Sequence, residues 1–156
     1  MYDVTFAKTL IKGKIAETLF QKIFEGSRKY IVLPLGYEQT NPVIRQFNYI
    51  PEINKALKNI SDTPDFALVN KTTEEVMIVE VKYRTSTTPS SLKQIARGIA
   101  KNWNTAYLFL VTPDGFYFDT CESVIGTGFI TPLSTKLVSD KKQNQYNAVL
   151  HEYINS

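Results

Sequence analysis

The sequence has few of the residues from which most metal and redox centres are built. It contains one cysteine, Cys121, and one histidine, His151, among 156 residues. A single cysteine cannot form a disulfide within the chain, and it excludes a cysteine-rich zinc cluster. A single histidine excludes sites that need two or more. Any metal must therefore be held by carboxylate and carbonyl oxygens, which are ligands that suit Mg²⁺ or Mn²⁺.

Long apolar runs and a secretory leader are also missing. The longest runs, such as 31–35 and 76–79, are far too short to cross a bilayer. Residues 1–4 contain no basic stretch followed by an apolar segment, so no secretory signal is predicted. We therefore expect a cytoplasmic protein with no membrane partner. The net charge of +3 is compatible with a polyanionic partner but does not require one.

Hydrophobic periodicity predicts both helices and strands. Ile11, Ile15, Leu19 and Ile23 recur every four residues, which is typical of a helix with one buried face. Runs rich in β-branched and aromatic residues, bounded by turn residues, indicate strands. In chain order we expect a helix over about 8–24, a strand over 30–35, a short helix over 51–59, strands over 66–70 and 76–83, a helix from Ser90 or Ser91 to about Trp103, strands over 106–112 and 116–118, and a closing helix around 146–154.

This order predicts an α/β or α+β protein, a sandwich with a mixed central sheet flanked by helices. The length and the 43% hydrophobic content favour a single domain over 1–156. We expect its core over about 8–119 and a variable insertion over 36–63. Residues 134–156 would form a polar segment, mobile over 134–145, and the C-terminal helix.

Two acidic residues on neighbouring strands are predicted to face each other. If the strands form a hairpin around their polar loop, Asn70 pairs with Glu75, and five steps later Asp65 faces Glu80. Directly opposed residues have Cβ atoms roughly 5 Å apart, and two carboxylates so close repel strongly unless a cation lies between them. Because side chains alternate along a strand, Lys82 projects from the same face as Glu80.

The strand that leads to Glu80 is apolar on both faces. Residues 76–79 show no alternation of apolar and polar side chains, so both faces of this strand should be covered. Charges at the end of such a strand are costly unless they are paired or bound to metal. The alternative is an exposed Glu80–Lys82 ion pair, with Asp65 merely following a turn proline. We favour the metal site because the proline, the register and the apolar run coincide.

These residues resemble a known superfamily. Pro64-Asp65, followed fifteen residues after the aspartate by Glu80-Val81-Lys82, resembles the PD-(D/E)XK nuclease signature. The resemblance implies metal-dependent hydrolysis of phosphodiester bonds in DNA. It also implies a restriction-endonuclease-like fold, a three-layer sandwich with a mixed sheet between helices.

The resemblance extends to two helices and covers about 12–112. A glutamate on the first helix, Glu17, is similar to one in archaeal Holliday junction resolvases and related enzymes. A glutamine after the catalytic strand, Gln94, matches many members and would help to place Lys82 or the phosphate. A solvated position is the alternative for both residues. Residues 36–63 depart from the family, because this segment is longer than in compact resolvases.

The resemblance also implies roles for individual residues. Asp65 and Glu80 would bind one or two Mg²⁺ (or Mn²⁺) ions, joined by the Val81 backbone carbonyl and by Glu17. One metal-bound water would become the nucleophile. Lys82 would orient or help to deprotonate this water and offset charge in the transition state.

Basic residues near the catalytic strand are candidates for nucleic-acid contact. Lys93, Arg97 and Lys101 are spaced by four residues and so form one stripe on a helix, which could follow a phosphate backbone. The alternative is an ordinary solvated face. Arg84 is a better candidate, because it lies two residues past Lys82 and on the same side.

The leading hypothesis is a Mg²⁺-dependent endonuclease that acts on DNA, with branched or junction DNA as an open choice of substrate. A junction resolvase would require a homodimer, because two strands are cut symmetrically. A nuclease toxin that attacks DNA or tRNA is one alternative. Others are a non-catalytic nucleic-acid-binding module with a nuclease-like fold and an unrelated α/β protein with a coincidental motif. These residues do not separate DNA from RNA.

Overall fold

A five-stranded mixed sheet lies at the centre of the protein, as seen in a computed structural model that describes residues 4–35 and 63–154. The β3 and β4 strands are parallel, and the other neighbouring strands are antiparallel. The mixed sheet expected from the sequence is therefore confirmed. The helix expected over 51–59 lies outside the described residues. In sheet order the strands are β1 (Tyr30–Pro34), β2 (Phe66–Asn70), β3 (Val76–Tyr83), β4 (Tyr107–Thr112) and β5 (Gly115–Thr120).

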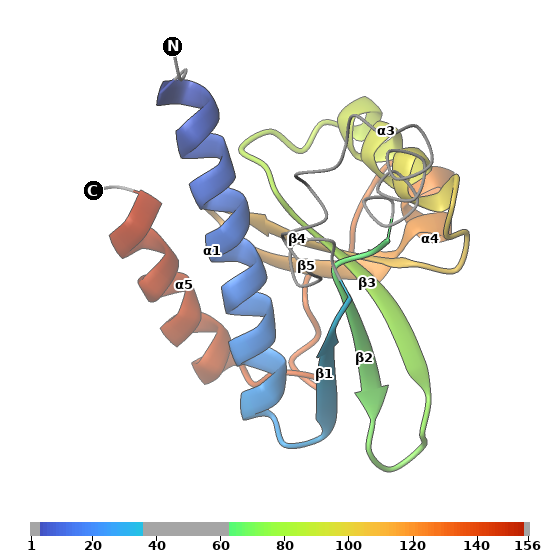
Figure 1. The fold of residues 1–156 in the computed structure, drawn as a ribbon. Coiled ribbons are helices and arrows are strands. Elements are labelled where there is room, and N and C mark those ends of the chain that lie inside the picture. The colour runs from blue at the N-terminus through green and yellow to red at the C-terminus, as the bar shows by residue number, and fades with distance from the viewer. Residues whose placement is uncertain (1–3, 36–62, 155–156) are drawn as a thin grey trace, which may run out of the picture.

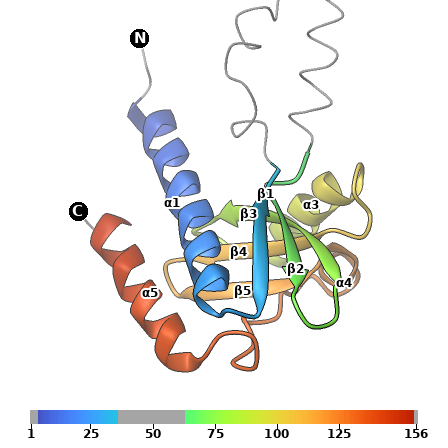
Figure 2. The ribbon, with the colours of Figure 1, turned by 60° about the horizontal axis from the view of Figure 1, so that its bottom comes forward.

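Helices cover both faces of this sheet. Figure 1 shows α1 (Val4–Gly26) beside α5 (Asp140–Ile154), with α3 (Pro89–Ala100) and α4 (Cys121–Thr127) on the other side of the sheet. Figure 2 shows the same separation after a rotation. Two hydrophobic clusters match the two faces, one packed under α1 and α5 and one under α3 and α4. This arrangement is compatible with the expected sandwich. In the described ranges, no helix combines the length and apolar character needed to span a membrane.

The α3 helix differs from the prediction at both ends. Its N-cap is Thr88, whose hydroxyl oxygen accepts a hydrogen bond from the Ser91 N–H at 3.3 Å, and Pro89 occupies the first turn. This favourable use of proline explains why the helix starts before Ser90 or Ser91. The helix ends at Ala100, so Trp103 lies beyond it. The Trp103 side chain is 38% exposed.

One helix was not predicted. The α4 helix has only seven residues, too few to show a hydrophobic period. Its end signals are clear, however. Thr120 is the N-cap, with its hydroxyl oxygen accepting from the Ser123 N–H at 3.1 Å, and Gly128 ends the helix in a left-handed conformation with φ of 74°.

Residues 134–145, expected as a polar and mobile segment, contain a buried residue and the start of a helix. Val138 is 2% exposed, and α5 begins at Asp140. The side-chain amide of Gln143 donates to the carbonyls of Leu133 and Val138 at 3.0 and 2.9 Å. A polar side chain of this segment therefore bonds to backbone carbonyls within the fold.

The α1 helix starts at Val4, earlier than the expected residue 8. Its buried residues lie only between Ala16 and Phe24. Ile11, expected on the buried stripe, is 59% exposed, because it lies before this packed part of the helix. Phe20 and Phe24 instead pack against Phe109 of β4, with ring centroids 5.0 and 6.0 Å away.

Candidate metal and phosphate site

The β2–β3 register brings the two predicted carboxylates together. The strands pair as expected, and the Asn70 N–H donates to the Glu75 carbonyl at 2.9 Å. Counting outward in this register puts Asp65 opposite Glu80, one step beyond the last paired residues. Hydrogen-bonded and non-hydrogen-bonded pairs alternate, so Asp65 and Glu80 form a pair of the closer, non-hydrogen-bonded kind.

Backbone chemistry fixes the Asp65 side chain. Pro64 has no amide N–H and cannot continue the antiparallel ladder. The Val81 N–H donates to the Asp65 side chain, 2.8 Å from Oδ2. One carboxylate oxygen is thereby held against β3, at the point where the two strands part.

The two carboxylates lie where negative charge is unfavourable. Burial, and next the charge of Glu80, raises the pKa of Asp65 to about 6, and the Val81 N–H, Lys82 and a hydrogen bond with Glu17 oppose this only in part. Burial also raises the pKa of Glu80, while Lys82 lowers it. A divalent cation would relieve this repulsion and favour both ionised carboxylates.

The amine of Lys82 lies beside the acid pair. Its Nζ is 3.3 Å from Glu80 Oε1, and the Lys82 and Glu80 side chains are 33% and 18% exposed. Both residues pair with β4 residues, Leu108 and Leu110, that pack under α3 and α4. Glu80 and Lys82 therefore project from this same face, as their spacing predicts. The ion pair of the alternative interpretation is also present, but it is only partly open to solvent.

Glu17 reaches the same place from α1. It hydrogen-bonds Asp65, and its charge raises the pKa of Glu80. It also forms an ion pair with Lys14, with Oε2 and Nζ 3.4 Å apart. Across residues 4–35 and 63–154, no group of three or more His, Cys, Asp or Glu side chains could hold a metal ion. Asp65 and Glu80 are the candidate metal ligands, and Glu17 lies beside them.

Glu80 lines two hollows, and Asp65 lines the larger of them. The larger, about 600 Å³, lies between α1 and the end of β3, and the smaller, about 490 Å³, lies between β3 and α3. Glu80, Lys82 and Arg84 line both, so a chain-like ligand could pass from one hollow into the other. The remaining lining residues are Thr9, Leu10, Lys12, Gly13, Lys14, Glu17, Asp65, Val81, Tyr83 and Thr85 in the larger hollow, and Thr63, Pro64, Ser91, Gln94, Ile95, Gly98, Ile99, Asn102 and Trp103 in the smaller.

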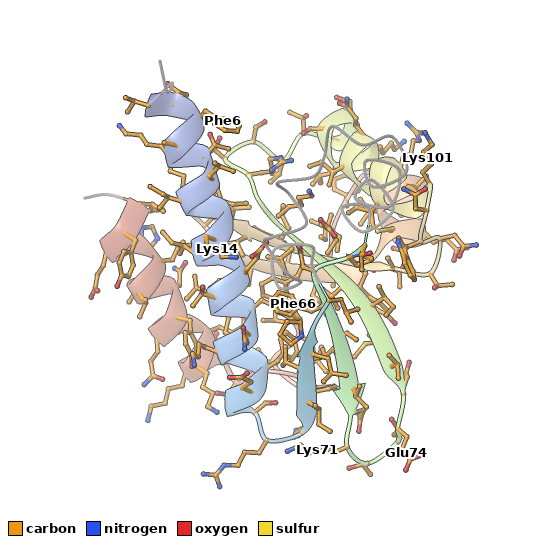
Figure 3. All side chains as sticks on the ribbon, viewed as in Figure 1. Phe6, Lys14, Phe66, Lys71, Glu74 and Lys101 are labelled. Carbon is orange, nitrogen blue, oxygen red and sulfur yellow. The ribbon has the colours of Figure 1, made fainter. Side chains whose placement is uncertain are left out.

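The predicted basic and polar residues divide into two groups. Arg84 lines both hollows, with its Nη1 donating to the Tyr83 carbonyl at 2.8 Å, and Gln94 lines the smaller one. The stripe of Lys93, Arg97 and Lys101 lines neither. In Figure 3 Lys101 lies at the end of α3 that faces away from α1. The structure does not bring this stripe to the acid pair.

Two lysines that the sequence could not assign line the larger hollow. Lys12 places its Nζ over the Tyr83 ring, 5.6 Å from the centroid. Lys14 is labelled on α1 in Figure 3 and pairs with Glu17. Both lysines precede Glu17 by about one turn on the same helix. This spacing indicates a role only because α1 packs beside β3, a contact that the sequence alone does not give.

The donor set fits Mg²⁺ or Mn²⁺. Mg²⁺ binds oxygen ligands, usually uses one or two carboxylates and keeps several waters. Two constrained carboxylates at one point meet this requirement without further protein ligands. In comparisons with known proteins, no family model and no curated protein matches this sequence. The resemblance to PD-(D/E)XK nucleases therefore remains an expectation from its residues.

Proposed function

We propose that the protein is a Mg²⁺-dependent endonuclease that hydrolyses phosphodiester bonds in DNA, built on a restriction-endonuclease-like fold. One observation carries this proposal. Asp65, directly before β2, and Glu80, on the paired strand β3, both lie mostly buried. Burial raises the pKa of both carboxyls, the charge of Glu80 raises that of Asp65 further, and the Lys82 amine lies alongside. Two acids and an amine at one point, open to two hollows, suit the binding and cleavage of a phosphodiester.

Each residue has a distinct task in this proposal. Asp65 and Glu80, together with the Val81 carbonyl, would hold the metal. When bound, Mg²⁺ lowers the pKa of its water and neutralises phosphate charge. Lys82 would place its ammonium against the charge that develops on the phosphate oxygens. Arg84 would hold a phosphate next to the cleaved one, since cations in a groove follow the backbone.

Cleavage of supercoiled plasmid in Mg²⁺, Mn²⁺ or EDTA tests the proposal. We expect cutting by the wild type only with metal. Glu80→Gln and Lys82→Ala should each lower the rate at least about 100-fold, because each removes a group that acts on the reacting phosphate. Glu152→Gln, an exposed change on α5, is the matched control and should cut like the wild type.

The other outcomes separate the alternatives. Absence of cutting by the wild type in either metal would contradict the proposal. DNA binding without cutting would instead favour a non-catalytic binding module, and cleavage of tRNA alone would favour a toxin. A preference for four-way junctions, together with a homodimer in sedimentation, would identify a resolvase.

A further inference from the structure

The smaller hollow differs in chemistry from the larger one. Its wall contains Trp103, which is 38% exposed, beside the apolar side chains of Ile95 and Ile99. It also contains the side-chain amides of Gln94 and Asn102. An aromatic ring, an apolar floor and amides that both donate and accept hydrogen bonds are the groups that bind a nucleobase.

The wall of this hollow contains a glycine, Gly98, which has no side chain. Gly98 lies inside α3, where glycine is less favourable than alanine. A Cβ placed on Gly98 would meet no atom of residues 4–35 and 63–154 within 4 Å. As far as these residues are concerned, the wall of the hollow is open at this position.

The position of the hollow relates it to the acid pair. Glu80, Lys82 and Arg84 form part of its wall and also part of the wall of the larger hollow. A phosphate held at the acid pair would thus have the Trp103 hollow on one flank. On the other flank it would have the lysines of α1, Lys12 and Lys14, which suit further phosphates.

We propose that the hollow between β3 and α3 binds an unstacked nucleobase adjacent to the phosphate that is cut, with Trp103 as the stacking platform. This inference rests on the proposed function and specifies its substrate. A base within a continuous duplex is paired and stacked, and it must leave the helix to enter a side pocket. The preferred substrate is therefore DNA with unpaired nucleotides at the cleavage point, such as a single strand, a flap or a branch.

Trp103 is the only tryptophan in the chain, so its fluorescence reports on this hollow alone. We expect a single-stranded oligonucleotide of about twelve nucleotides, within the usual site sizes, to quench this fluorescence. The titration uses the whole protein with Ca²⁺ in place of Mg²⁺. A blunt duplex of the same sequence should quench it far less. Equal quenching by both, or none by either, would overturn the proposal.

Four variants test the pocket by affinity, measured as the anisotropy of a fluorescein-labelled single strand. Trp103→Leu should weaken binding at least about tenfold, because stacking on an aromatic ring is lost, and Trp103→Phe should recover most of it. Gly98→Leu fills the open space and should also weaken binding about tenfold. Glu152→Gln, an exposed change on α5, is the control and should bind like the wild type.

The two proposals fail in different ways. Wild-type affinity in both Trp103→Leu and Gly98→Leu would overturn the base pocket, while metal-dependent plasmid cutting would leave the nuclease in place. Quenching and the variant series as expected, with no cutting by the wild type, would overturn the nuclease and leave the pocket as a single-strand binding site. Circular dichroism of each variant separates lost binding from lost folding.

Discussion

At the scale of the residue, the account depends on how Asp65 is held. Its carboxylate accepts the Val81 N–H at 2.8 Å, faces Glu80 and is mostly withdrawn from water. Burial and the neighbouring charge make ionisation of such a group more costly than in water unless a cation is present. The arrangement therefore costs stability at neutral pH in the absence of metal, which is typical of a functional site rather than of a structural ion pair.

This cost predicts that Asp65→Asn stabilises the metal-free protein at neutral pH. The pKa of Asp65 is raised from 3.8 to about 6 in the folded protein. Its favourable contribution to stability is therefore fully present below about 3.8 and is lost as the pH rises through about 6. We expect the variant to exceed the wild type by roughly 3 kcal/mol in free energy of unfolding at pH 7.5, and by well under about 1 kcal/mol at pH 4.

Urea unfolding in EDTA at several pH values measures this difference. The asparagine oxygen can still accept the Val81 N–H, so the change removes mainly the charge. Glu152→Gln on the exposed surface of α5 serves as the control and should leave the pH profile unchanged. A variant less stable than the wild type at pH 7.5 would show that the surroundings of Asp65 do not disfavour its ionised form.

Residues of the site were predictable to different degrees. Asp65, Glu80 and Lys82 followed from strand register and alternation, which are local rules with a period of two. Trp103 was misplaced because its position depends on where α3 ends, and helix ends are set by capping and packing that a periodic pattern does not report. Lys12 and Lys14 needed the packing of α1 against β3, which is a long-range contact.

At the scale of the element, α3 connects the parallel strands β3 and β4 and forms one wall of the smaller hollow. Parallel neighbours require such a crossover. The start of α3 meets the end of α4, where Gly128 lies close to Pro89 and Lys93. The strands and longer helices were foreseen because their apolar patterns span several turns or alternations. The α4 helix was missed because only its capping residues mark it.

Two glycine-to-alanine changes should have opposite effects on stability. Gly98→Ala should raise the free energy of unfolding by about 0.5–1 kcal/mol, since alanine favours the helix and the methyl group meets no atom in the described part of the chain. Gly128→Ala should lower it by at least about 1 kcal/mol. There φ is +74°, and the new Cβ would lie 3.0 Å from Pro89 Cβ and 3.1 Å from Lys93 Cε.

Chemical denaturation of both variants at one pH measures these effects, and each variant serves as the other's control for the loss of glycine. Destabilisation by Gly98→Ala would mean that the space beside α3 is filled. A neutral Gly128→Ala would mean that α3 and α4 are not closely packed at this point.

At the scale of the whole molecule, the acid pair lies where the two halves of the sandwich meet. Asp65 lies directly before β2, and Glu80 lies on β3. Glu17 comes from α1, which packs on the first hydrophobic cluster, and Gln94 comes from α3, which packs on the second hydrophobic cluster. The sequence predicted the mixed sheet and its helical layers. It did not predict that two hollows would share Glu80 and Lys82, because this depends on how both helices pack.

A crystal structure grown with Mn²⁺ tests the central claim most directly. Mn²⁺ can be located by its anomalous scattering, and it prefers the same oxygen ligands as Mg²⁺. We predict one anomalous peak within about 2.5 Å of both an Asp65 and a Glu80 carboxylate oxygen, a distance typical of oxygen ligands. A crystal that binds Mn²⁺ only elsewhere, or carboxylates that turn away from each other, would contradict the account.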